Sequence, residues 1–259
     1  RGGRIKRIAR SVSHMLCLFP FEPEIYERAG VPVSYVGHPL ADVFPLEPDR
    51  AETRARLGVP ANAAVVALLP GSRQSEVRNL ADTYIATARL LQAGNPEIIF
   101  LVPLATRETR QIFEEALRRN QAADLPVRML FGHAVDAMTA ADVVLVASGT
   151  ASLEAALLKR PMVITYRIGK WQYRLMKHMA YLPWVGLPNI LCRETIVPEL
   201  LQDEATPDRL AEAVADWLRD PARRAAAENR FRELHLSLRQ DTARRAAEAI
   251  LPYLASARP

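Results

Sequence analysis

The chain has 259 residues, of which 49% are hydrophobic, and its 34 Lys and Arg against 29 Asp and Glu give a formal net charge of +5. This length fits one or two domains, and the mild basic excess fits an anionic substrate or membrane surface. No zinc-finger spacing or aromatic-basic RNA signature supports a nucleic-acid partner. No apolar run approaches the ~20 residues of a transmembrane helix, no secretory signal opens the chain, and two lone cysteines fit a reducing compartment; we expect a cytoplasmic protein.

The first 45 residues predict a small α/β segment. Its expected elements are an opening helix, a strand at Met15–Phe19, a helix at Pro23–Ala29 and a strand at Val33–Val36. The chain opens on Arg1-Gly2-Gly3 without an initiator methionine and reads as the middle of a domain, so we expect an N-terminal portion to precede it. Prolines then mark a linker over residues 46–62, with a short helix at Arg50–Leu57 inside it.

From residue 63 onward strands and helices alternate. The predicted strands are Val65–Leu69, Ile98–Val102, Val127–Phe131, Val143–Ala147 and Met162–Tyr166, and the predicted helices between them are 74–93, 107–119, 134–140 and 151–158. Alternation of this kind requires right-handed crossovers and a parallel sheet, and strands rich in Val, Ile and Leu are typical of a sheet covered on both faces. After Asn189 the pattern predicts helices near 194–202, 207–219, 221–238 and 240–255.

Two turns in this alternation predict an anion site. Ser148-Gly149-Thr150 follows one buried strand and Gly71-Ser72-Arg73 follows another, each directly before a helix. Backbone N–H groups at a helix N-terminus favour a phosphate, and an arginine can clamp its oxygens. Ordinary explanations stay open, because Ser and Thr are common N-caps and a βα turn can carry a solvated arginine. Two such turns in one sheet suggest a nucleotide held between them.

Glu154 follows the second turn and is expected in the first turn of its helix. It would either complement the helix dipole or accept hydrogen bonds from both hydroxyls of a ribose. Asn189, in Leu187-Pro188-Asn189-Ile190, could contact a sugar or phosphate or could cap a turn, and His38 is more often structural than catalytic before a proline. The basic and aromatic residues of Lys170–Trp184 fit an interfacial helix or a half-buried helix with a charged face.

The chain contains no Asp-x-Asp pair, no His/Asp/Cys cluster with metal spacing, no Gly-x-Gly-x-x-Gly and no Walker A pattern. We therefore expect no metal and no cofactor. The charge of a departing diphosphate would be met by Arg73 and the two helix N-termini.

Taken together, the motifs closely resemble the lipid-A-disaccharide synthase family. The matching segments, in order over essentially the whole chain, are Phe19–Glu22, Val36–Asp42, Leu68–Glu76, Ser148–Glu154, Pro161–Arg167, Leu187–Leu191 and Val197–Gln202.

The resemblance implies a metal-free GT-B glycosyltransferase with two Rossmann-like domains. It would condense UDP-2,3-diacylglucosamine with 2,3-diacylglucosamine 1-phosphate to give the β-1,6-linked lipid A disaccharide and UDP. Residues 1–45 would be the remnant of the acceptor domain, residues 63–222 the UDP-sugar domain, and residues 223–259 helices that return toward the N-terminal domain.

The site residues that the resemblance implies are Gly71, Ser72, Arg73, Ser148, Gly149, Thr150, Glu154 and Asn189, with Arg73 stabilising the leaving diphosphate. The general base belongs to the part expected before Arg1. The resemblance also implies peripheral contact with the cytoplasmic face of the inner membrane, and it leaves homo-oligomers open. Two alternatives remain at this point: another GT-B enzyme of UDP-N-acetylglucosamine (an epimerase or a peptidoglycan transferase), or a non-catalytic UDP-binding fragment.

Overall fold

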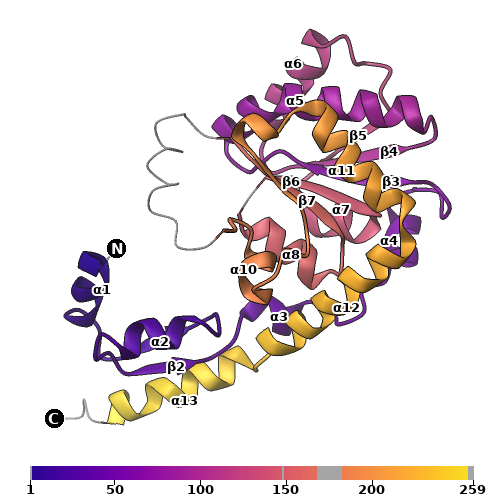
Figure 1. Ribbon diagram of the computed structural model, residues 1–259. Coiled ribbons are helices and arrows are strands. Elements are labelled where there is room, and N and C mark those ends of the chain that lie inside the picture. Colours follow the sequence, from indigo (N-terminus) through magenta and orange to yellow (C-terminus); the bar gives the residue numbers. More distant parts are fainter. Residues whose placement is uncertain (1, 148, 168–182, 256–259) are drawn as a thin grey trace. The chain divides into compact units, whose positions relative to one another are not determined.

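The computed structural model describes residues 2–147, 149–167 and 183–255, and its contacts divide the chain into two compact units (Figure 1). Unit 1 comprises residues up to Leu46 together with residues from Arg232 onward, and unit 2 comprises Glu47–Phe231. The second boundary falls inside helix α12 (Pro221–Leu238).

Unit 2 is built on a six-stranded parallel sheet of order β5-β4-β3-β6-β7-β8. Its strands are β3 (Val65–Leu69), β4 (Ile99–Leu104), β5 (Val127–Phe131), β6 (Val143–Ala147), β7 (Met162–Tyr166) and β8 (Glu199–Leu201). Every residue of β3 and β6 is buried, as expected for central strands covered on both faces. The α/β fold class is therefore confirmed, and four strands have the bounds that the sequence predicts.

Helices form a layer on each face of this sheet (Figure 1). One layer contains α5 (Gln74–Gly94), α6 (Arg107–Arg119) and α11 (Pro207–Arg219), where α5 contacts both other helices. The other layer contains α4 (Arg50–Arg56), α7 (Ala134–Ala140), α8 (Thr150–Leu157) and α10 (Leu187–Cys192). The core between the layers includes Trp217, Tyr84, Phe100 and Phe113, each at most 1% exposed.

The helix predicted over 194–202 is wrong. The structure has helix α10 at Leu187–Cys192, followed by strand β8 and a single 3-10 turn at Gln202–Glu204. Strand β8 pairs in parallel with β7, with Ile164 opposite Glu199, and Ile164 N donates to Pro198 O over 3.0 Å. Backbone hydrogen bonds to a neighbouring strand therefore outweigh the local helical preference of this segment.

Unit 1 joins the two ends of the chain. It contains α1 (Gly2–Ala9), β1 (Met15–Cys17), α2 (Glu22–Glu27), β2 (Val33–Tyr35), α3 (Pro39–Val43), the end of α12 and α13 (Thr242–Ala255). Strands β1 and β2 pair in parallel, and His38 N donates to Leu238 O over 2.9 Å. The short helix α3 was not predicted, although Pro39 at its first position and the His38 side chain, which accepts from Leu40 N, are helix-start signals.

Candidate functional site

A cavity of about 620 Å³ lies over the carboxyl ends of the strands of unit 2. It is centred where β3 and β6 are neighbours, which is the point at which the strand order reverses: β4 and β5 follow on one side of β3, and β6, β7 and β8 on the other. Ligands of open α/β sheets bind in the crevice that this reversal creates. The cavity is lined by residues at or just beyond the ends of five different strands, among them Gly71, Ser72, Arg73, Glu76, Ala105, Gly132, Gly149, Thr150, Glu154, Tyr166 and Val185.

The turn between β3 and α5 carries an internal carboxylate. Glu76 Oε2 accepts from the backbone N–H groups of Ser72 (3.0 Å) and Arg73 (3.2 Å), and Glu76 Oε1 lies 3.2 Å from Arg73 Nη1. Gly71 has φ +121°, and a Cβ on it would lie 2.5 Å from Glu76 Cβ. Only glycine therefore fits this close approach. The N–H groups of Ser72 and Arg73, expected to face a phosphate, are thus occupied by Glu76.

The turn between β6 and α8 is open by contrast. Gly149, with φ +152°, is the N-cap of α8, and no side chain of the described residues caps the first turn of this helix. The Ser152 hydroxyl instead donates to Gly149 O over 2.8 Å, within the turn. Gly149 and Thr150 are exposed and line the cavity. An uncapped helix N-terminus directs backbone N–H groups and positive potential at whatever enters. Ser148 lies outside the described residues.

Glu154 lines the same cavity, but it lies one residue further into its helix than predicted and so just beyond the first turn. Helix α8 begins at Thr150, so Glu154 is its fifth residue and the first turn holds no acidic residue. The expected place in the first turn is therefore wrong, and the helix-dipole interpretation loses its basis, because that effect fades beyond one turn. Burial raises the pKa of Glu154, and no ion pair or side-chain hydrogen bond joins it to another described residue. Its carboxylate is available to a ligand.

Asn189 is not among the residues that line the cavity. Its side chain is completely buried in α10, where Nδ2 donates to Val197 O (2.9 Å) and Glu199 Oε1 (2.8 Å). Its Oδ1 accepts from the N–H groups of Ile196 (2.9 Å) and Val197 (3.1 Å). These four bonds use the whole hydrogen-bonding capacity of the amide inside the protein. The structure thus brings Arg73, Thr150 and Glu154 to one cavity and leaves Asn189 outside its lining.

Two residues of the site were missed by sequence reasoning as functional groups. Glu76 stands three positions after the N-cap residue Arg73, a spacing that marks helix starts and could have found it. Glu199 accepts from the N–H groups of Val185 (2.7 Å) and Gly186 (3.0 Å), and so holds Val185 at the cavity wall. No local signal shows the role of Glu199, because the contact depends on strand β8.

The remaining candidate features lie elsewhere. His38 caps helix α3 in unit 1. Lys170–Trp184 falls outside the described residues except for its last two positions, so both interpretations of that segment stay open. Within the described ranges there is no group of three or more His, Cys, Asp or Glu placed to hold a metal ion. Among those same residues, no helix combines the length and the apolar character that crossing a bilayer requires.

Solved structures with this fold include a UDP-bound protein and a glycosyltransferase. The Anabaena protein HepE, in complex with UDP and glucose, superposes with a TM-score of 0.54 at 17% identity over 98% of this chain and 66% of its own. The glycosyltransferase WaaG, involved in lipopolysaccharide biosynthesis, gives 0.54 at 16% identity over 90% of this chain and 62% of its own. At these identities the likeness establishes the fold, a Rossmann-like architecture of the GT-B type.

Sequence relatives are much closer. The lipid-A-disaccharide synthase of Azoarcus sp. (strain BH72) is 74% identical over 99% of this chain, and that of Aromatoleum aromaticum is 74% identical over 98%. The chain spans 66% and 65% of the lengths of these two relatives. A family profile described as Lipid-A-disaccharide synthetase matches residues 1–252. The chain therefore belongs to the lipid-A-disaccharide synthetase family.

Proposed function

We propose that this chain is the UDP-sugar-binding part of an enzyme that transfers 2,3-diacylglucosamine from UDP to 2,3-diacylglucosamine 1-phosphate. The products are the β-1,6-linked lipid A disaccharide and UDP. Membership of the family supports the reaction, and the cavity at the strand-order reversal of unit 2 supports a nucleotide there. The HepE structure with UDP and glucose shares the fold.

The observation that carries the proposal is the difference between the two turns. The N–H groups at the start of α5 already face Glu76, whereas the start of α8 is uncapped and open to the cavity. We place the diphosphate at the N-terminus of α8, where the helix dipole favours negative charge. Arg73 is 81% exposed and paired only with Glu76 among the described residues, so its side chain can turn toward the same phosphates.

Each remaining group then has one role. Arg73 neutralises charge that develops on the diphosphate as the sugar–oxygen bond breaks, which is where preorganised cations lower the barrier most. Glu154 accepts the two ribose hydroxyls, and no partner among the described residues has to be displaced from its carboxylate. Asn189 and Glu199 hold the wall that carries Val185. The acceptor and the general base belong to sequence outside this chain, and we place the enzyme at the cytoplasmic face of the inner membrane.

The test is Arg73→Ala in the full-length enzyme, assayed for disaccharide formation. Turnover should fall roughly 100-fold, as when one charge-stabilising donor is lost from an active site. Arg78→Ala is the matched control, because Arg78 lies on α5, bonds Gln74 and is absent from the cavity lining. Unchanged turnover with Arg73→Ala would remove Arg73 from the mechanism. UDP binding without transfer in the full-length enzyme would support the non-catalytic alternative instead.

A further inference from the structure

Unit 2 has a second cavity, of about 760 Å³, at the opposite edge of the sheet. Residues that precede three strands line it: Ala64 before β3, Ile98 before β4 and Asp142 before β6. Its other walls come from α4, the end of α5 and α11. The proposed donor cavity lies over the carboxyl ends of the same strands, so the two sites are separate.

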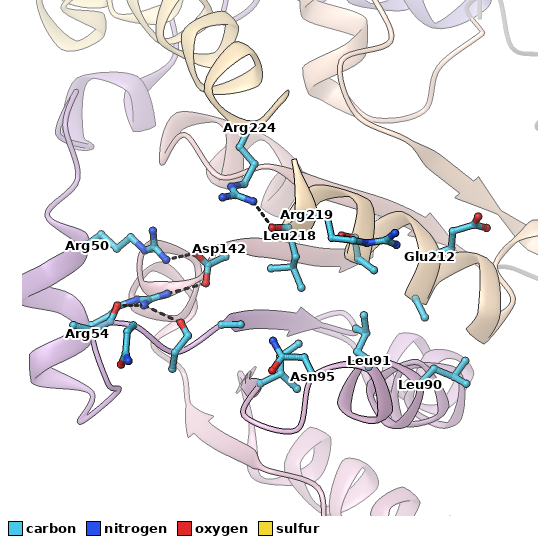
Figure 2. A pocket seen from close by; sticks show the side chains of 18 residues that line it. Arg50, Arg54, Leu90, Leu91, Asn95, Asp142, Glu212, Leu218, Arg219 and Arg224 are labelled. Atoms are coloured by element: carbon cyan, nitrogen blue, oxygen red, sulfur yellow. Dashed lines mark hydrogen bonds and ion pairs between the residues drawn. The ribbon is translucent and has the colours of Figure 1, made fainter. Parts of the chain in front are cut away.

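One end of this cavity is strongly basic. Figure 2 shows Arg50 and Arg54 converging on Asp142, with Arg224 above them. Arg54 Nη2 lies 2.9 Å from Asp142 Oδ2, and Arg50 pairs with the other oxygen of the same carboxylate. Two guanidinium groups thus share one carboxylate at this end, and the third, that of Arg224, lines the same cavity. Burial lowers the pKa of Arg54, and the neighbouring charge of Arg50 lowers it further, as expected where positive charge is in excess.

The three arginines differ in how far the protein already uses them. Arg54 is 5% exposed, and all three of its nitrogens donate to carbonyl oxygens or to Asp142. Arg50 is 36% exposed, and its Nε is buried without a partner among the described residues. Arg224 donates from Nη1 to the carbonyl oxygens of Trp217 and Leu218, at 2.6 and 2.7 Å. Arg54 is therefore structural, whereas Arg50 and Arg224 retain donor capacity toward the cavity.

The rest of the cavity is mainly apolar. Leu90, Leu91 and Ile98 form one wall, and Ala211, Ala215 and Leu218 of α11 form the facing wall, which also carries the charged residues Glu212 and Arg219. Leu90 is 43% exposed, so part of its apolar surface at the mouth of the cavity faces water, which is unfavourable. In Figure 2 Leu90 and Leu91 lie away from the basic end, beyond Asn95, whereas Leu218 lies beside Arg224. A cavity with clustered arginines at one end and mainly apolar side chains along its walls complements a molecule with an anionic head and an apolar chain.

We propose that this cavity binds an amphipathic anion, with its carboxylate or phosphate head between Arg50 and Arg224 and its alkyl chain along Leu90, Leu91 and Leu218. Among the described residues, Asp142 is the single carboxylate paired with Arg50 and Arg54 at this end of the cavity. The anionic head would supply further negative charge through charge-assisted hydrogen bonds from Arg50 and Arg224. The volume far exceeds that of a bare phosphate, so the alkyl portion is part of the recognised chemistry. This inference does not depend on the reaction proposed for the other cavity.

The test is calorimetric titration of the chain with octanoate and octyl phosphate below their micellar concentrations. Octylammonium, 1-octanol and inorganic phosphate serve as probes of the head and the chain separately. We expect both anions to bind, and the three other probes to bind at least tenfold more weakly. The tighter of the two anions identifies the preferred head group. Binding of 1-octanol or of inorganic phosphate as tight as that of the amphipathic anions would overturn the proposal. The first result would show that the cavity recognises only the alkyl chain, and the second that it recognises only the anionic head.

Two variants locate the site. Arg224→Gln removes one head contact and should weaken octanoate binding roughly tenfold, the usual scale for a charged hydrogen bond. Ala215→Phe keeps every charge and places a large side chain in the apolar part of the cavity. It should therefore weaken the binding of octanoate and leave the N-cap of α11 unchanged. Arg209→Gln is the matched control, because Arg209 lies on α11 outside the cavity and pairs with Glu204. Circular dichroism confirms folding, and wild-type affinity in both test variants would refute the assignment.

Discussion

Replacing Asn189 by alanine removes four hydrogen bonds from a side chain with no exposed surface. Val197 is also fully buried, and both its N–H and its C=O lose their described partner in the variant. Each buried group left unsatisfied costs ~1–3 kcal/mol. Ile196 is only half-buried and can turn to water, and Glu199 keeps its bonds to Val185 and Gly186. We expect a loss of roughly 3 kcal/mol of unfolding free energy.

The measurement is urea denaturation followed by far-UV circular dichroism, with UDP affinity from calorimetry under native conditions. The midpoint should shift at an unchanged slope, and UDP affinity should fall less than tenfold, because Asn189 acts on the cavity only through Glu199 and Val185. Asn95→Ala is the matched control: its side chain accepts a single bond, from Glu97 N at 3.3 Å, so the variant should lose less than about 1 kcal/mol.

The opposite pattern would refute this reasoning. If Asn189→Ala keeps the stability of the wild type within about 1 kcal/mol and loses UDP binding tenfold or more, the amide turns toward the ligand. The sequence-based expectation of a direct sugar or phosphate contact would then hold, and the four internal bonds would have to be exchanged when the donor binds.

Three further predictions concern charge and close packing. Glu154→Gln should raise stability at neutral pH, because burial raises the pKa of the folded carboxyl and so penalises its ionised form; the gain should vanish once the pH falls below the unfolded pKa, while UDP binding weakens. Gly71→Ala should lower UDP affinity, because the added Cβ would lie 2.5 Å from Glu76 Cβ at a φ of +121°. A UDP affinity of the variant equal to that of the wild type, measured by calorimetry, would contradict this. Asp142→Asn should lower the free energy of unfolding in urea by about 3 kcal/mol, because Arg50 and Arg54 both lose the carboxylate with which they pair. Asp216→Asn is the control: its pair with Arg219 is exposed, so stability should change by less than about 0.5 kcal/mol.

The sequence by itself determines most of the architecture of unit 2. Runs such as Val65–Leu69 and Val143–Ala147 are apolar throughout, and the segments between them have helical periodicity. These signals are local, because each element must bury its own apolar face. The parallel order also places the turns after β3 and β6 at one edge of the sheet, whereas the juxtaposition of Arg73 with Thr150 and Glu154 also requires β3 and β6 to be neighbours in the strand order.

Tertiary structure decides what those residues can do. Strand β8 replaces an expected helix because β7 offers it hydrogen bonds from a segment more than 30 residues away. That pairing brings Glu199 to Asn189 and turns a candidate ligand contact into a buried support. Glu76 occupies one of the two predicted phosphate turns and leaves the other open. The basic cavity around Asp142 joins residues from α4, β6 and α12. Glu76 follows a local helix-start spacing, but the other outcomes depend on which charges and amides meet across the fold, and no local pattern in the sequence encodes that.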